Sequence, residues 1–128
     1  MDHLVEMLFM GDLMFKTFSQ YRKFPFTFEN VIIVVYFHDM EKIFREQSEE
    51  IDKSVWYTSE LPNMGITFSE PELNALEFIH GEPDNLHNPD SRIMNELASF
   101  CHAIDNMSAR LWYNYGRSSG ELGVLGIK

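Results

Sequence analysis

The pattern of apolar positions predicts a long helix near each end of the chain. Over residues 3–19 the apolar residues recur close to the 3.6-residue period of a helix, and Gly11 only weakens this pattern. Over residues 90–115 they form one continuous stripe, and Gly116 is positioned to end the helix. The residues of this second stripe are Ile93, Leu97, Phe100, Ile104, Met107 and Leu111.

Residues 28–47 combine two conflicting signals. The stretch 31–37 is β-branched and continuously apolar, which by propensity alone favours a buried strand. However, the apolar pattern continues without Gly or Pro into a charged segment, and Thr27 offers an N-cap before it. A run of about twenty residues without a helix breaker is more typical of a helix. We therefore predict one buried helix over residues 28–47.

Capping and turn signals predict a further helix and two connections in the rest of the chain. Ser69 and Glu72 match a capping box, which predicts a helix that ends at Gly81. Residues 48–68 and 81–89 contain Pro and Gly and are predicted to be surface connections. The expected fold class is all-α, a compact helical bundle.

Composition and charge narrow the class of protein. The chain is 45% hydrophobic, with eleven Phe, five Tyr and two Trp, which suffices for the core of one domain. We place that domain over residues 1–116, followed by a loosely packed tail over residues 117–128. Twenty acidic residues against ten basic ones give a net charge of −10, which argues against binding to a nucleic-acid duplex through its phosphates.

The cysteine content and the N-terminal sequence bear on the compartment. A lone cysteine, Cys101, excludes an internal disulfide framework, favours a reducing compartment and is expected to be a small buried hydrophobe. There is no N-terminal targeting signal and no apolar run long enough to span a bilayer. We therefore expect a cytoplasmic protein that does not bind membranes.

Two surface features bear on possible partners. Residues 60–96 contain eight acidic residues and a single basic one, Arg92. A solvated acidic face explains this bias, and a docking site for a basic partner is the alternative. Aromatic side chains expected at the surface would suit a homodimer. They are Trp56, Tyr57, Trp112 and Tyr113.

The dipeptide His38–Asp39 is the clearest indication of chemistry. It follows the apolar run, where an imidazole and a carboxylate are costly to bury unless they are paired or bind a metal. The alternative is a pair that faces solvent at the end of the helix.

The residues around this dipeptide resemble the central helix of the HD-domain metal-dependent phosphohydrolases. In that family an apolar run precedes His-Asp and a Lys follows three residues later, where this chain has Lys42. The family also has a His well upstream and an Asp far downstream. Here His3 lies 35 residues before His38, and Asp105 lies 66 residues after Asp39. The resemblance covers most of the chain except its tail, and it implies helices that bring the ligands around one cleft.

The resemblance implies a metal site made by His3, His38, Asp39 and Asp105. Two imidazoles and two carboxylates form a mixed nitrogen and oxygen set, which suits Mn²⁺, Co²⁺, Fe²⁺, Ni²⁺, Zn²⁺ or Mg²⁺. Such an ion would have open positions for water and for a phosphate oxygen, so it could activate the water and polarise the phosphorus. Because His3 is close to the N-terminus, either the first helix is firmly docked or this ligand is missing.

Catalytic roles are expected for Asp39 and three further residues. Glu41 stands where many family members have Gly, and it could orient the water as a base or pair with Arg45. Lys42 would bind phosphate as a point charge. His80 follows a predicted helix, where it could contact a substrate phosphate, bind a second metal ion or simply cap the helix.

The remaining histidines are expected to be outside the ligand set. His87 should lie at the surface, and His102 should support a ligand or fill the core. The sequence thus predicts a phosphohydrolase that cleaves a phosphate ester of a nucleotide or similar small phosphorylated metabolite. The alternatives are a non-catalytic HD-fold binding or regulatory protein and, last, an acidic protein that occupies a basic groove on another protein.

Overall fold

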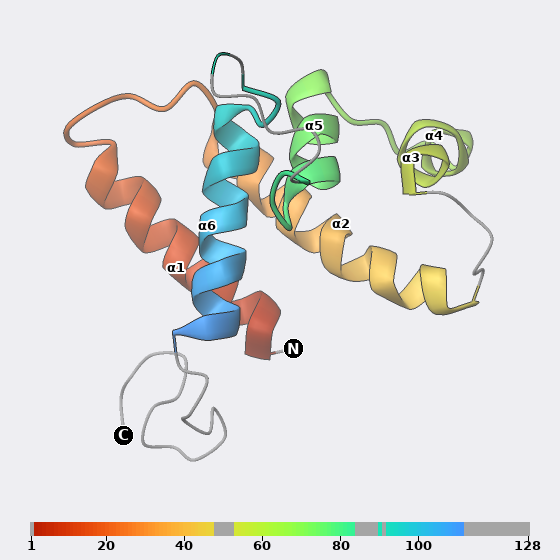
Figure 1. Cartoon of the computed structure of the whole chain (residues 1–128), viewed down its shortest axis with the longest axis horizontal. Helices are drawn as coiled ribbons and strands as arrows, with labels where there is room; N and C mark the ends of the chain where they lie inside the picture. Colours follow the sequence, from red (N-terminus) through yellow and green to blue (C-terminus); the bar gives the residue numbers. More distant parts are fainter. Residues whose placement is uncertain (1, 48–52, 84–89, 91, 112–128) are drawn as a thin grey trace.

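The fold of the described residues consists of helices without strands, so the all-α prediction is confirmed. A computed structural model describes residues 2–47, 53–83, 90 and 92–111, except the side chains of Asp2 and of residues 41–47. The helices are, in chain order, α1 (Asp2–Phe18), α2 (Phe28–Gln47), α3 (Lys53–Val55), η1 (Trp56–Glu60), α4 (Leu61–Asn63), α5 (Glu70–Phe78) and α6 (Glu96–Arg110). Helix α6 packs against α1, α2 and α5, and α2 also packs against α1 and α5 (Figure 1).

Helix α2 resolves the conflict between the strand and helix signals. Val31, Val34, Val35 and His38 are all buried, and their spacing of three and four residues places them on one face of a helix. Thr27 begins the helix, since its hydroxyl accepts from the backbone N–H of Asn30, whose side-chain oxygen accepts from the backbone N–H of Thr27. The predicted helix over residues 28–47 is confirmed with the same bounds.

Helix α5 begins and ends at the predicted signals. The Ser69 side chain accepts from the backbone N–H of Glu72, and the Glu72 side chain accepts from the backbone N–H of Ser69. After the helix, Gly81 has a φ of 105°, a conformation that favours glycine, and its N–H donates to the carbonyl of Phe78. The capping box therefore fixes one end of α5, and the glycine turns the chain at the other.

Helix α6 begins later than the pattern predicts, and the predicted start at residue 90 is wrong. The Asn95 side chain accepts from the backbone N–H of Ala98 and caps the helix. The backbone N–H of Asn95 donates to the Asn74 side chain, which also donates to the carbonyl of Ile93. These bonds attach the chain before α6 to α5 outside the helix, with Asn95 in an extended conformation, although Ile93 fits the apolar stripe.

Residues 53–63 are helical and pack on the core, so the surface connection predicted over residues 48–68 is wrong for this part. Trp56, Tyr57 and Leu61 are buried, and the Tyr57 hydroxyl donates to the carbonyl of Phe37 at 3.3 Å. Trp56 and Tyr57 are therefore core residues and not the exposed aromatics that were expected. Their packing against distant residues is a tertiary effect that short local patterns do not encode.

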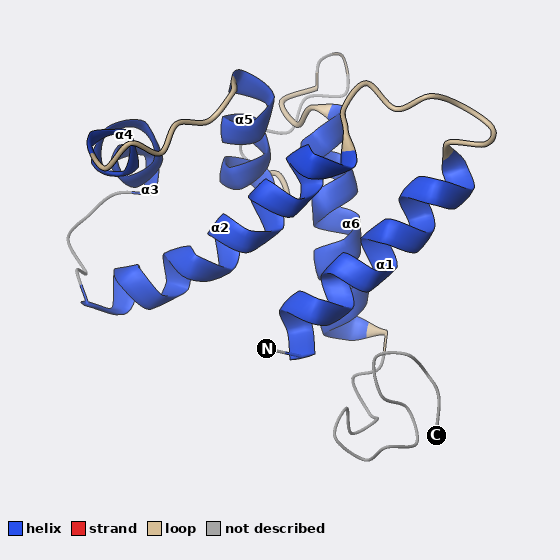
Figure 2. Ribbon diagram, turned by 180° about the vertical axis from the view of Figure 1, so that it is seen from behind, coloured by secondary structure: helices blue, strands red, loops and turns tan. Residues whose placement is uncertain are grey.

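Glycine in α1 permits a close approach of α1 to α6, which lie side by side (Figure 2). A Cβ atom at Gly11 would lie 3.2 Å from Ile104 Cδ1 and 3.5 Å from the ring of Phe28. Met7 and Met10, on the preceding turn, are buried in the same core. Gly11 thus interrupts the apolar pattern of α1 because a side chain larger than that of alanine would push α1 away from α6.

Several predictions concern residues that the structure does not describe. The boundary at residue 116, the tail over residues 117–128 and the aromatic residues Trp112 and Tyr113 lie outside the described part of the chain, as do residues 84–89. Among the described residues, no helix combines the length and apolar character needed to cross a membrane.

Candidate metal centre

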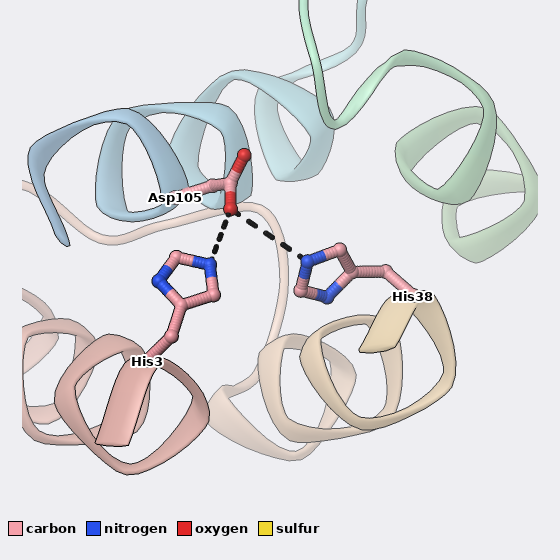
Figure 3. Close-up of side chains that lie close together, drawn as sticks. All are labelled: His3, His38 and Asp105. Atoms are coloured by element: carbon pink, nitrogen blue, oxygen red, sulfur yellow. Dashed lines mark hydrogen bonds and ion pairs between the residues drawn. The ribbon is translucent and has the colours of Figure 1, made fainter. Parts of the chain in front are cut away.

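Three side chains from separate helices converge on one point between α1, α2 and α6 (Figure 3). His3 is on α1, His38 is on α2 and Asp105 is on α6, and their potential ligand atoms all lie within 4.8 Å of one another. The Oδ1 atom of Asp105 is 2.9 Å from His3 Nε2 and 3.6 Å from His38 Nε2. Residues that are far apart in the sequence therefore form one cluster.

The partner of His38 Nδ1 fixes the tautomer of the neutral ring. His38 Nδ1 lies 2.6 Å from the backbone carbonyl of Val35, which accepts only, so Nδ1 is the donor. In the neutral ring Nε2 then has a lone pair and no hydrogen. This atom is buried without a hydrogen-bond partner among the described residues, because Asp105 at 3.6 Å is beyond hydrogen-bond distance.

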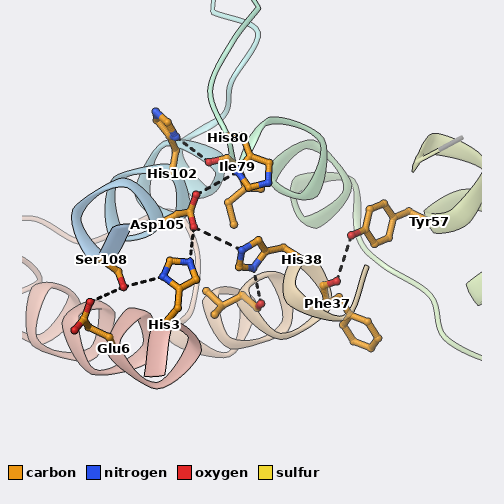
Figure 4. A network of polar contacts seen from close by, with 11 residues as sticks. His3, Glu6, Phe37, His38, Tyr57, Ile79, His80, His102, Asp105 and Ser108 are labelled. Atoms are coloured by element: carbon orange, nitrogen blue, oxygen red, sulfur yellow. Dashed lines mark hydrogen bonds and ion pairs between the residues drawn. The ribbon is translucent and has the colours of Figure 1, made fainter. Parts of the chain in front are cut away.

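His3 is in contact with Asp105 on one side and with a buried pair on the other (Figure 4). His3 Nδ1 lies 2.9 Å from the hydroxyl oxygen of Ser108, and that hydroxyl donates to Glu6 Oε1 at 2.6 Å. Ser108 is fully buried and Glu6 is 3% exposed, whereas the side chain of His3 is 23% exposed. The cluster is therefore open to solvent at His3 and closed behind it.

Asp105 also contacts a third histidine through its second oxygen. His80, just beyond α5, places Nδ1 3.2 Å from Asp105 Oδ2, and its side chain is 55% exposed. Burial alone would raise the pKa of Asp105, but the facing imidazoles of His3, His38 and His80 outweigh it and hold that pKa well below its usual range. Asp105 is therefore an ionised carboxylate that uses both oxygens.

Asp39, the fourth predicted ligand, is not in the cluster. Successive residues of a helix project about 100° apart, and the ring of His38 is turned into the core. Asp39 is half-buried on α2 and does not join the group of potential ligands. The structure therefore brings together three of the four predicted ligands. Glu41 and Lys42 belong to α2, but their side chains are outside the described part of the chain.

The remaining histidine and cysteine predictions concern residues near the cluster. His102 Nδ1 donates to the carbonyl of Ile79 at 2.8 Å. His102 therefore stabilises the end of α5 and does not support one of the predicted ligands. Cys101 is buried and free, as expected. Its burial, together with a smaller contribution from the charge of Asp105, raises the pKa of the thiol to about 12. His87 lies outside the described residues.

Glu6 and Ser108 are not among the site residues that the sequence predicts. Each lies three residues after a predicted ligand, Glu6 after His3 and Ser108 after Asp105, so each shares a helix face with that ligand. This spacing was the available signal. It could not show that the two faces meet, because that depends on how α1 docks on α6.

The cluster fits a divalent metal ion in its distances and its donor atoms. Two ligand atoms that each lie about 2.1 Å from one ion are about 3.0–3.4 Å apart at octahedral or tetrahedral angles. The observed separations of 2.9 and 3.6 Å, both measured from Asp105 Oδ1, are close to this range. Two imidazoles and a carboxylate are ligands for transition metals rather than for Ca²⁺, which binds oxygen.

The fold and the cluster define an all-helical protein with a His–His–Asp centre at the meeting point of three helices. Comparisons with protein-family models, with curated proteins and with solved structures find no match to this chain.

Proposed function

We propose that this protein is a metal-dependent phosphohydrolase of the HD type, with one divalent ion held by His3, His38 and Asp105. The observation that supports it most directly is the fully buried Nε2 atom of His38, which has no hydrogen-bond partner among the described residues and lies 3.6 Å from the Asp105 carboxylate. A buried nitrogen lone pair without a partner costs about 1–3 kcal/mol. A cation between the imidazole and the carboxylate would remove this cost and satisfy both groups.

The residues of the cluster would have different roles in binding the ion and the substrate. A divalent ion bound there would supply a water of lowered pKa and polarise a phosphoryl oxygen. His38 and Asp105, both largely buried, would fix the position of the ion, whereas His3 and His80 lie toward solvent, where a substrate arrives. We assign to His80 a contact with the substrate phosphate, because its ring is more than half exposed beside Asp105 Oδ2.

The substrate class follows from the resemblance to the HD family. It is a phosphate ester of a nucleotide or a similar small phosphorylated metabolite, whose P–O bond is cleaved by water. Lys42 would bind the phosphate and Glu41 would orient the water, as the sequence predicts.

Metal content and phosphate release test the proposal together. The protein, purified without chelator or a metal-affinity tag, should contain about one equivalent of a transition metal, and Asp105→Asn should remove it. With Mn²⁺, Co²⁺ or Mg²⁺ supplied, the wild type should release phosphate from at least one member of a panel of nucleotides and sugar phosphates. Absence of metal in the wild type, at any supplied concentration, would refute the metal site.

One observation favours a second function, a non-catalytic binding or regulatory protein. Asp39 is outside the cluster, so the ion would have one carboxylate ligand where the resembling family has two. The same experiment separates the two functions. Stoichiometric metal without turnover of any substrate would favour the binding protein, and turnover that is lost in Asp105→Asn would favour the enzyme.

A further inference from the structure

We infer that Glu6 and Ser108 are positioning residues that hold a proton on Nδ1 of His3 and direct its Nε2 at the metal site. They touch neither the proposed ion nor a substrate, and they act through His3. The effect on metal affinity rests on the proposed function, whereas the effect on the His3 proton is a property of the metal-free protein.

The two residues are built into the core behind His3. Ser108 is fully buried on α6, Glu6 is 3% exposed on α1, and the contact between them is 2.6 Å long. A contact this short between a hydroxyl and a carboxylate is typical of a charge-assisted hydrogen bond. The serine proton is therefore directed to Glu6, and the serine oxygen faces His3 only with its lone pairs.

This arrangement decides which nitrogen of His3 is protonated. Because the Ser108 oxygen accepts, His3 Nδ1 must donate across the 2.9 Å that separates them. Three contacts lie in series, from Glu6 to Ser108, from Ser108 to His3 and from His3 to Asp105. The other ring nitrogen, Nε2, is the one that faces Asp105 Oδ1 and the proposed ion.

His38, the second histidine of the cluster, also has an oxygen acceptor behind its ring, here a backbone carbonyl. The carbonyl of Val35 accepts from His38 Nδ1, so His38 also directs its Nε2 toward Asp105 Oδ1. The two rings come from different helices, yet an acceptor behind each one selects the same tautomer. Oxygen acceptors that orient ligating imidazoles in this way typically change metal affinity by 10–100-fold.

The proton on His3 can be measured directly. In ¹⁵N-labelled metal-free wild-type protein, long-range ¹H–¹⁵N spectra of the histidine rings should show a protonated Nδ1 for His3. In Ser108→Ala, Nδ1 has no acceptor, so the proton should move to Nε2 and bond to Asp105. Ser99→Ala is the matched control, because Ser99 is an exposed serine of α6 whose hydroxyl donates to the backbone carbonyl of Asn95.

Metal affinity is the second readout, obtained by titration with Co²⁺ and its visible absorption. Ser108→Ala should bind Co²⁺ about 10–100-fold more weakly than wild type, and Ser99→Ala should bind it equally well. If Ser108→Ala does not fold, as judged by its helical circular dichroism, the isosteric Glu6→Gln takes its place and should weaken binding in the same direction.

The outcomes separate the two claims. A bare Nδ1 on His3 in the wild type, or equal Co²⁺ affinity of the position-108 and position-99 variants, would overturn the positioning role. A wild type that binds no Co²⁺ would refute the proposed function, while the ring spectra would still decide how Glu6 and Ser108 act on His3.

Discussion

Replacing His38 by leucine should stabilise the metal-free protein and abolish its response to metal. The imidazole is fully buried, and within the described part of the chain its Nε2 has no hydrogen-bond partner. Removing an unsatisfied buried polar atom gains about 1–3 kcal/mol, and losing the bond from Nδ1 to Val35 costs about 1 kcal/mol. The free energy of unfolding of His38→Leu should therefore be about 0–2 kcal/mol higher than that of wild type.

When metal is added, wild type should become more stable than His38→Leu. A ligand present at 100 times its Kd stabilises the folded state by about 2.7 kcal/mol. Wild type should gain this amount with Co²⁺, whereas His38→Leu should gain nothing. Urea unfolding measures the free energy of unfolding of both proteins with and without Co²⁺. Thermal unfolding should show the same reversal in stability.

His102→Leu is the matched control for this experiment. His102 donates to the carbonyl of Ile79 but does not join the cluster. Its loss should destabilise the protein by about 1 kcal/mol and leave the gain with Co²⁺ intact. The reasoning fails if His38→Leu retains the gain, or if it loses several kcal/mol without metal, since His38 would then serve only to fill the core.

Three further predictions follow from single features of the structure. Gly11→Leu should lower the free energy of unfolding in urea by about 1–3 kcal/mol and weaken Co²⁺ binding, because the leucine side chain would separate α1 from α6. Gly11→Ala should leave both nearly unchanged. Equal effects of the two substitutions would refute the close approach of the helices. Asp39→Asn should leave metal content unchanged, and loss of metal would show that Asp39 is a ligand after all. Because burial raises the pKa of Cys101 to about 12, the thiol ionises first in the unfolded chain. The free energy of unfolding should thus fall by up to about 1.4 kcal/mol per pH unit between pH 9 and 12, and Cys101→Ala should not show this part of the decrease; identical pH profiles would contradict it.

Local signals in the sequence were sufficient for the helices that begin and end at strong caps. Ser69 and Glu72 predict the start of α5 because the capping box is made entirely by neighbouring residues. The start of α6 was predicted too early because Asn95, the true cap, is fixed by Asn74 of another helix. The turns over residues 53–63 were missed for the same reason, since their buried aromatics pack against residues distant in sequence.

The candidate site could be predicted only as far as its residue types. The residues around His38 and Asp105 point to metal chemistry, and the structure places both in one cluster. The sequence could not show that Asp39, one residue along α2, does not join it. Nor could it identify Glu6 and Ser108, because their contact depends on the docking of α1 against α6.

The cluster exists only when α1 is docked, so the proposed binding of metal would be linked to folding. His3 and Asp105 are 102 residues apart, and their contact depends on the packing of Met7, Met10 and Gly11 against the core. An unfolded chain offers no preformed site, so the free energy of binding the proposed ion would add to the free energy of folding. An ion at this point would join α1, α2 and α6 through one ligand from each, which is why a ligand so close to the N-terminus can be held in place.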